Sequence, residues 1–250
     1  MTRALTCLAC LLLSLPAAAM VGGASAPPAP VAKSVVTIVG SRGNFCTGTA
    51  IAPDLVLTAA HCVLPGADYK IVQYDSARQP LLRDVKSVNA HPKFDLQTML
   101  GHRATADVAL LKLAAPLSGV EPASFGAPGT VARGDEFLVA GAGVTTRGDG
   151  KSGGTVRAAT LATTGRPGNL QIRLFDPATK GERAGLGACT GDSGAPVFRS
   201  ADGRFTLIGV VSWSTGPGNS AGCGGLTGVT PLALYGEWIT RTAKALGNQF

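Results

Sequence analysis

The residues of this chain best suited to chemistry surround Ser193, in the segment Gly191-Asp192-Ser193-Gly194-Ala195-Pro196. Small residues on both sides of a serine allow a sharp turn that leaves its hydroxyl and the nearby N–H groups facing outward. Taken alone, the segment could equally be an ordinary polar turn. A serine hydroxyl becomes a useful nucleophile when a base takes its proton and an acid orients that base. The rest of the chain must therefore supply a base and an acid.

Two other segments contain such a pair. The segment Thr58-Ala59-Ala60-His61-Cys62 offers an imidazole, whose ordinary pKa of about 6.5 suits proton transfer at neutral pH. Asp107 begins the apolar run that continues through Leu113, which favours a buried position for its carboxylate. The sequence therefore predicts a triad. His61 would take the proton of Ser193, while Asp107 fixes the tautomer of His61 and stabilises the imidazolium.

The other histidines and the nearby acids are expected to be surface residues. His91 and His102 both lie in loop-like contexts. Asp54 and Asp84 lie near predicted strands, but neither begins an apolar run as Asp107 does. We therefore predict no catalytic role for these four.

The order His61, Asp107, Ser193 resembles that of the trypsin/chymotrypsin-like serine proteases. Subtilisin and the α/β-hydrolases use other orders, and the Gly-x-Ser-x-Gly elbow of the hydrolases fails here because position 195 is Ala. Further blocks resemble the same family in register: Phe45-Cys46-Thr47-Gly48-Thr49, Ser212-Trp213-Ser214 and Tyr235-Gly236-Glu237-Trp238-Ile239. The resemblance covers nearly the whole chain.

The resemblance implies an all-β fold, with two six-stranded antiparallel β-barrels, a C-terminal helix and the active site in the cleft between the barrels. The peptidase domain would span residues 31–250. The first barrel, about 31–123, would contribute the base and the acid, and the second, about 124–231, the nucleophile. The helix would follow at about 232–246. The implied activity is that of an exported serine endopeptidase acting on protein or peptide substrates.

Composition agrees with that fold class. The chain has 34 glycines and many short runs of Val, Ile, Leu and Thr, such as 35–39, 55–58 and 207–211. Such runs favour strands joined by turns over long helices. The formal net charge is +7, but no basic run and no interleaving of basic with aromatic residues accompanies it. We therefore expect no nucleic-acid partner.

The first part of the chain, residues 1–19, is typical of an export signal. Arg3 gives a positive start, Leu5 to Leu15 an apolar stretch, and Ala17-Ala18-Ala19 a small-residue cleavage site. The apolar stretch is shorter than the ~20 residues that span a bilayer. Residues 20–30 would form an extended lead-in. We expect a secreted or periplasmic monomer with no stable membrane insertion.

Cysteine usage supports export. Removal of the signal would leave Cys46, Cys62, Cys189 and Cys223. Four cysteines allow three pairings. A zinc site is the alternative, but no two of them have C-x-x-C spacing, and an oxidising compartment favours disulfides. The resemblance implies the pairs Cys46–Cys62 and Cys189–Cys223. The expected chemistry needs no metal and no organic cofactor.

The resemblance also assigns substrate contacts. The backbone N–H groups of Gly191 and Ser193 would form the oxyanion hole. Gly187 would be the base of the primary specificity pocket, where trypsin-like members carry an Asp that pairs with Lys or Arg. Without that acid we expect cleavage after apolar or small residues, since a buried guanidinium would lack a partner. Arg183, swinging into the pocket, would instead select acidic residues. The remaining contacts would be Ala188, Ser212, Trp213, Ser214 and a glycine near Gly225 or Gly228.

The segment Val21-Gly22-Gly23 resembles the start of the mature chain in this family. By that resemblance, a freed α-ammonium on Val21 would form an ion pair with Asp192 and hold the nucleophile loop in its working shape. A signal cut after Ala19 would leave Met20 ahead of Val21, and a plain glycine-rich linker is the alternative interpretation.

Two other functions use the same residues. A secreted pseudoprotease or binding protein would keep the fold without turnover, and the intact triad counts against it. An esterase would use the same nucleophile, and the strand-like segment Ser212-Trp213-Ser214 favours an extended peptide over a small ester.

Overall fold

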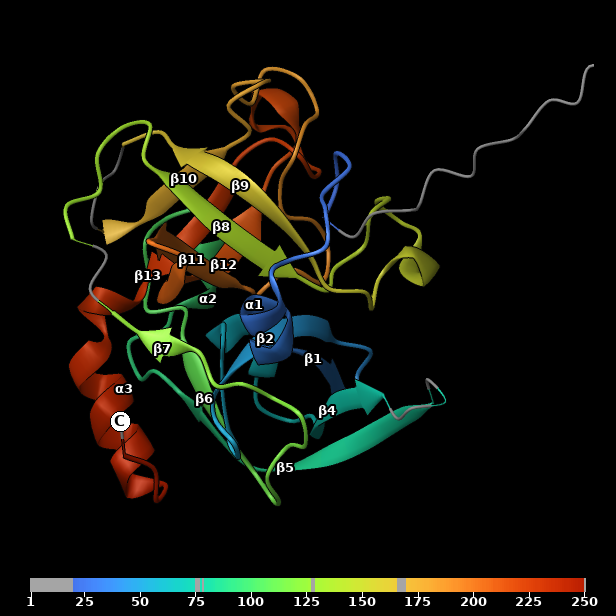
Figure 1. Ribbon diagram of the computed structural model, residues 1–250, viewed down its shortest axis with the longest axis vertical. Helices are drawn as coiled ribbons and strands as arrows, with labels where there is room; N and C mark the ends of the chain where they lie inside the picture. Colours follow the sequence, from blue (N-terminus) through green and yellow to red (C-terminus); the bar gives the residue numbers. More distant parts are fainter. Residues whose placement is uncertain (1–19, 75–76, 78, 127–128, 166–169, 250) are drawn as a thin grey trace, which may run out of the picture.

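The computed structural model describes residues 20–74, 77, 79–126, 129–165 and 170–249. Within these residues two β-barrels stand one above the other, and helix α3 (Gly236–Ala245) runs along the side of the lower one (Figure 1). The predicted export signal, residues 1–19, lies outside the described residues.

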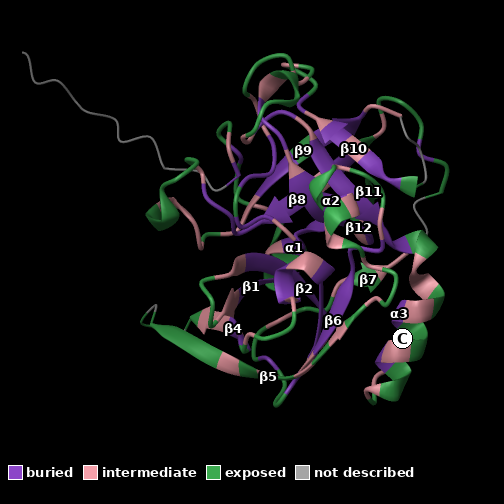
Figure 2. Ribbon diagram, turned by 180° about the vertical axis from the view of Figure 1, so that it is seen from behind, coloured by how far each residue is buried: buried purple, intermediate pink, exposed green. Residues whose placement is uncertain are grey.

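The first barrel is a closed ring of antiparallel strands in the order β1-β2-β3-β6-β5-β4. Its strands are β1 (Val35–Gly40), β2 (Phe45–Ala52), β3 (Leu55–Thr58), β4 (Tyr69–Tyr74), β5 (Pro80–Ala90) and β6 (Ala109–Leu113). Alternate residues of each strand face inward, so Ile38, Val56, Ile71 and Leu111 meet in one apolar cluster. The outer strand β5 is mostly exposed (Figure 2).

The second barrel has the strand order β11-β8-β9-β10-β13-β12 and closes through pairing of β11 with β12. Its strands are β8 (Glu136–Gly141), β9 (Arg157–Thr163), β10 (Ile172–Phe175), β11 (Pro196–Ala201), β12 (Arg204–Ser214) and β13 (Thr227–Pro231). The two-residue strand β7 (Ser124–Phe125) adds to β12 in parallel. The predicted fold class, two six-stranded antiparallel barrels with a C-terminal helix, is confirmed.

Short helical segments complete the fold. They are α1 (Ala29–Ser34), α2 (Leu96–Leu100), η1 (Ala60–Val63), η2 (Gly150–Ser152), η4 (Pro217–Asn219) and η5 (Leu232–Leu234), besides α3. None of the helices in the described part of the chain is long and apolar enough to cross a membrane.

The C-terminal helix, expected as one element, is divided at Tyr235, whose backbone (φ −122°, ψ 5°) separates η5 from α3. Ile239 and Ala243 lie on one face of α3, four residues apart, and both are buried. They join an apolar cluster with Leu110 of the first barrel and Val210 of the second. The helix therefore packs on the apolar cluster that the two barrels share.

The lead-in, residues 20–30, is tied to the second barrel. Backbone bridges join Val21 to Gly187 and Ser25 to Ala158. The lead-in then enters α1, where a proline in the first turn presets a helical φ at no cost in hydrogen bonds. The start of the described chain is thus packed against the elements that carry Ser193.

Candidate active site

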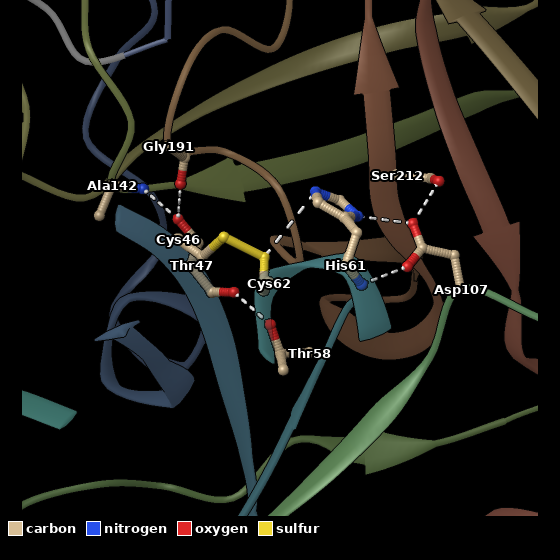
Figure 3. Close-up of a disulfide and its surroundings, with 9 residues drawn as sticks. All are labelled: Cys46, Thr47, Thr58, His61, Cys62, Asp107, Ala142, Gly191 and Ser212. Carbon is tan, nitrogen blue, oxygen red and sulfur yellow. Dashed lines mark hydrogen bonds and ion pairs between the residues drawn. A yellow bond between two sulfur atoms is a disulfide. The ribbon is translucent and has the colours of Figure 1, made fainter. Parts of the chain in front are cut away.

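Asp107 and His61 form the most fully connected polar pair of the site. Asp107 is fully buried two residues before β6, and His61 lies in η1. The Asp107 Oδ1 accepts from the His61 backbone N–H (2.9 Å), and Oδ2 lies 2.8 Å from His61 Nδ1 (Figure 3). The Ser212 hydroxyl donates to the same Oδ2 at 2.5 Å. These bonds compensate the burial of the carboxylate and leave the Nε2 of His61 as the free acceptor of its ring.

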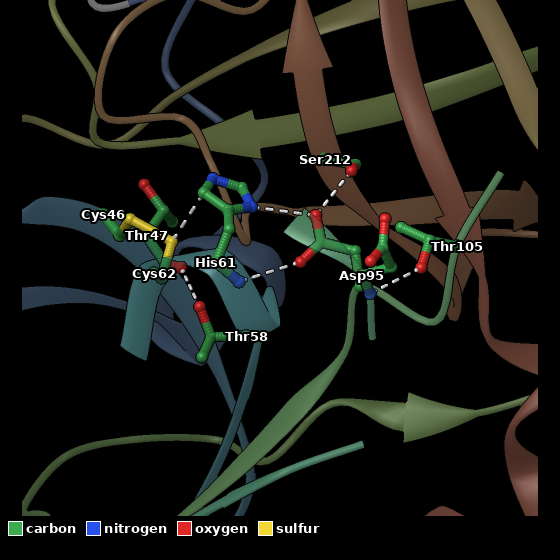
Figure 4. Close-up of polar contacts among 9 residues, drawn as sticks. Cys46, Thr47, Thr58, His61, Cys62, Asp95, Thr105 and Ser212 are labelled. Atoms are coloured by element: carbon green, nitrogen blue, oxygen red, sulfur yellow. Dashed lines mark hydrogen bonds and ion pairs between the residues drawn. A yellow bond between two sulfur atoms is a disulfide. The ribbon is translucent and has the colours of Figure 1, made fainter. Parts of the chain in front are cut away.

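The neighbouring chain holds both residues in place. The disulfide Cys46–Cys62 joins η1 to β2, with a Cα–Cα distance of 6.1 Å. Thr58 Oγ1 donates to the carbonyl of Thr47 (2.8 Å), which fixes the end of β3 below η1. On the other side, Thr105 Oγ1 accepts from the Asp95 N–H at 2.9 Å and steadies the segment before Asp107 (Figure 4).

The turn around Ser193 requires its glycines. Gly191 (φ +92°) and Gly194 (φ +79°) both adopt left-handed backbone that disfavours side chains. A Cβ on Gly191 would lie 2.5 Å from the Phe45 ring, and one on Gly194 would lie 2.1 Å from Thr58 Oγ1. The turn therefore packs directly onto the first barrel, which brings Ser193 to the same cleft as His61.

The backbone of this turn is oriented by Thr47 on β2. Thr47 Oγ1 donates to the Gly191 carbonyl and the Thr47 N–H donates to the Ser193 carbonyl, both at 2.8 Å. With these carbonyls turned toward β2, the N–H groups of Gly191 and Ser193 have no hydrogen-bond partner within the described residues. These are the two groups predicted to form an oxyanion hole.

His61 and Ser193 line one cavity of about 600 Å³ between the barrels. Among the described residues, no hydrogen bond joins Ser193 Oγ to His61 Nε2, and Nε2 lies 3.9 Å from Cys62 Sγ instead. Such bonds are often long before substrate binds and shorten in the reacting complex. The geometry therefore places the nucleophile and the base in one cleft without joining them.

Several predicted substrate contacts lie elsewhere. Gly187 and Ala188 are buried and do not line the cavity, because Gly187 packs against Gly224 and bridges Val21. The Ser212 hydroxyl points to Asp107. Of the predicted wall residues, Ser214 lines the cavity.

The Trp213 ring is covered rather than open. It stacks on the imidazole of His102, with centroids 4.5 Å apart, and the Arg173 guanidinium lies 5.5 Å from its centre. A Cβ on Gly228 would fall 2.0 Å from the same ring. His102, expected to be a plain surface residue, is thus part of the cavity wall.

Sequence reasoning missed the rest of the wall. Arg147 and the segment 219–222 line the same cavity as Thr190. Arg147 lies in an exposed glycine-containing loop, and its sequence context carries no signal of this position. The loop 215–225 closes on itself through the bonds Gly216 N–H to the Ser220 carbonyl (2.7 Å) and Gly225 N–H to the Thr215 carbonyl (2.9 Å).

Asp192 is the second fully buried carboxylate of the site. Its oxygens accept from the backbone N–H groups of Gly143 and Cys189, both at 2.8 Å. Burial raises the pKa of Asp192 to about 7, against the lowering effect of these two hydrogen bonds. The predicted ion pair requires a freed α-amine on Val21, which is an internal residue here and whose backbone bridges Gly187. Met20, not Val21, has the fully buried side chain, in the core of the second barrel.

The remaining cysteines are also joined, as Cys189–Cys223 with an S–S distance of 2.02 Å. Cys46, Cys62 and His61 place potential metal ligands within 4.8 Å of one another. Both sulfurs are bonded to each other, so neither is a thiolate that could bind zinc.

The Trypsin family model matches residues 20–239 of this chain. The match includes both barrels, both disulfides and the segments of His61, Asp107 and Ser193. Membership implies a hydrolase that acts as a serine peptidase on protein or peptide substrates. On this match the chain belongs to the trypsin family.

Proposed function

We propose that this protein is an exported serine endopeptidase that cleaves peptide bonds through an acyl-enzyme. The observation that carries the proposal is the hydrogen-bonded line from Ser212 through Asp107 to His61, which ends at the cavity that Ser193 shares. This line supplies an oriented base in the same cavity as a serine on a glycine-flanked turn, which are the parts that nucleophilic catalysis requires.

In the first half of the reaction, Ser193 Oγ attacks the carbonyl carbon of the scissile bond and His61 Nε2 takes its proton. Asp107 stays ionised and stabilises the imidazolium through the bond to Nδ1. The carbonyl oxygen becomes an oxyanion, for which the unpartnered N–H groups of Gly191 and Ser193 are available. One such donor is worth ~3 kcal/mol of barrier.

In the second half, the tetrahedral intermediate collapses and His61 gives its proton to the leaving amine. The acyl group is now an ester on Ser193. A water molecule attacks this ester while His61 takes a proton from the water, and the second intermediate releases the carboxylic acid and the free serine. No step needs a metal or an organic cofactor.

Export is supported by the two disulfides, which persist in oxidising compartments outside the cytoplasm. The proposal places the protein in the periplasm or the extracellular medium after removal of residues 1–19. Mass spectrometry of the protein recovered from cells would test this directly, because retention of the leader in the folded protein would contradict it.

The first residue of the mature chain is proposed to be Met20 rather than Val21. A cut after Ala19 leaves the Met20 side chain in its buried site. Removal of Met20 would empty that site, at a cost typical of a large-to-small core change. A charged α-amine at Met20 would supply the cation that the buried Asp192 carboxylate lacks.

The lack of a Ser193–His61 hydrogen bond is the one observation that favours a pseudoprotease. A fluorophosphonate reagent separates the two functions, since it reacts with an activated serine. We expect one adduct on Ser193 in the exported protein and none in Ser193→Ala. No adduct, or an adduct on another residue, would contradict the proposed function.

A further inference from the structure

Arg147 is a cation of the cavity wall with most of its guanidinium unused. Its Nη1 donates to the Ala221 carbonyl at 3.0 Å. No ion pair among the described residues includes Arg147, whereas Lys70, Lys112 and Arg199 each have a carboxylate partner. An arginine carries five N–H donors in a planar fork that matches a carboxylate. The remaining donors of Arg147 are therefore available to a ligand.

The loop that carries Arg147 is attached to the nucleophile side of the cavity. The Val144 N–H donates to the Thr190 carbonyl (2.9 Å), three residues before Ser193 in the chain. Arg147 itself bonds Ala221, another residue of the cavity lining. It thus links two segments of the cavity that Ser193 also lines.

The other side chains of this part of the cavity are hydroxyls and an amide: Thr190, Ser214, Asn219 and Ser220. No Asp or Glu is among the described residues that line the cavity. Ser214 Oγ makes only a long contact, 3.5 Å, to the Gly222 carbonyl. The wall therefore offers several donors and no carboxylate.

Gly187, expected as the base of the primary specificity pocket, is not among the described residues that line the cavity. A Cβ on Gly187 would lie 3.1 Å from the Gly224 Cα, and neither residue lines the cavity. In the cavity that Ser193 lines, the polar side chains named above form a recess that includes Arg147.

We propose that this recess binds an acidic side chain, Glu or Asp, in the residue before the cleaved bond, and that Arg147 determines this specificity. The inference rests on the proposed peptidase function and revises the preference for apolar or small residues. A substrate carboxylate would accept charge-assisted bonds from the free donors of Arg147, with the hydroxyls of Thr190 and Ser214 nearby. A Lys or Arg there would be repelled, and an apolar side chain would desolvate these groups without replacing their partners.

The other arginines near the site do not compete for this role. Arg183, the candidate from the sequence, is exposed and does not line the cavity. Arg173 stacks on Trp213 and donates to the His102 carbonyl at 3.2 Å. Arg183 is therefore a matched control for Arg147.

The test uses the exported protein and peptides that differ only in the residue before the cleaved bond: Glu, Gln, Leu or Lys. We expect kcat/KM to be highest for Glu. Arg147→Gln should lower the Glu-to-Gln ratio about ten- to hundredfold, the range for losing charged hydrogen bonds. Arg147→Lys should keep part of the ratio, and Arg183→Gln should keep all of it.

Fluorophosphonate labelling of Ser193 in every sample distinguishes failure of the specificity proposal from failure of the proposed peptidase function. Labelled wild-type protein that prefers Leu or Lys, or labelled Arg147→Gln that keeps the Glu-to-Gln ratio, would overturn the inference and leave the peptidase standing. An unlabelled wild-type protein would overturn both. If Arg147→Gln fails to fold, the wild-type Glu-to-Gln ratio decides alone, and it should shrink as salt screens the charge.

Discussion

Two aspartates lie fully buried at this site, and the protein holds them in different ways. Asp107 receives two side-chain bonds, from His61 and Ser212, besides one backbone N–H. Asp192 receives two backbone N–H groups, with no side-chain donor among the described residues. A buried carboxylate next to an ionisable imidazole is ready to stabilise a positive charge when one forms. A buried carboxylate held by neutral amides alone still lacks its counter-charge.

This difference assigns the two acids to different tasks. In the proposed mechanism, Asp107 acts in each catalytic cycle, because the charge that it stabilises appears and disappears on His61. Asp192 serves the shape of the turn, because its two amide donors, Gly143 and Cys189, come from the segments around the cavity. Substitutions can test each acid separately. We expect changes in kcat around Asp107 and changes in stability around Asp192.

The largest effect is expected from the groups that Asp107 supports. Ser193→Ala and His61→Ala should each lower kcat by about 10⁶-fold, and the double variant should be little worse, since the triad acts as a unit. Steady-state kinetics on a peptide with a fluorescent leaving group measures this. Substantial peptidase activity in Ser193→Ala would remove the basis of the proposed mechanism.

Changes at Asp107 itself should be the next largest. Asp107→Asn should keep the fold but lower kcat by about 10⁴-fold, because an amide favours the wrong imidazole tautomer. Ser212→Ala removes one of the three bonds to the carboxylate and should cost about tenfold or more. If Ser212→Ala were as damaging as Asp107→Asn, the hydroxyl would have to act on the substrate and not through Asp107.

At Asp192 the expected effect is on stability and depends on pH. In a chain that retains residues before Met20, burial raises the pKa of Asp192 from 3.8 to about 7. The folded state then binds the proton more tightly than the unfolded state. Its stabilisation is complete below pH ~4 and is lost as pH rises through about 7, by on the order of 4 kcal/mol.

A chain beginning at Met20 should not lose this stability, because its α-ammonium would hold the carboxylate ionised. Thermal unfolding of the two forms at pH 5 and pH 8.5 measures the difference. Equal pH dependence in both forms would mean that the α-amine does not reach Asp192. Full activity of the longer form would mean that the turn of Ser193 does not need this ion pair. A mature chain found to begin at Val21 would restore the first assignment from the sequence.

The features that could be predicted from the sequence are those in which the local backbone requires particular residues. Gly191 and Gly194 are required by a left-handed turn, and a short turn with His61 follows an apolar strand, so these motifs could be identified by their residues. The two barrels were predicted from the family resemblance and the short β-type runs, and that prediction is confirmed. The catalytic roles of the triad stay predictions.

What the sequence could not give depends on contacts between distant segments. Arg147 reaches the cavity by bonding Ala221, 74 residues away. Counting back from Ser193 locates Gly187 but cannot reveal that Gly224 fills the space beside it. The sequence motif points to Val21 as the first residue of the mature chain, and only burial reveals that the neighbouring Met20 side chain lies in the core. The ion pair with Asp192 stays a prediction.

The smallest expected effect concerns His91, which has no predicted catalytic role. Its effect on stability changes with pH in the opposite direction to that of Asp192. Its ring meets Tyr235 and Trp238 edge-on, with centroids 5.1 and 4.9 Å away. Burial, with the nearby charges of Lys93 and Arg241, lowers the pKa of His91. The unfolded state then binds the proton more tightly. The stability that His91 contributes is therefore present above its ordinary pKa of about 6.5 and lost as pH falls below it.

His91→Gln should flatten the thermal-unfolding midpoint between pH 7 and pH 5 in the chain beginning at Met20. The longer chain should still lose the Asp192 stabilisation as pH rises from about 4 to about 7. The two aromatic neighbours would still pack on an uncharged side chain, so the comparison isolates the charge. A His91→Gln variant that keeps the acid-side loss would trace it to other groups. One that also removed the loss between about pH 4 and pH 7 in the longer chain would show that the titrations of His91 and Asp192 are coupled.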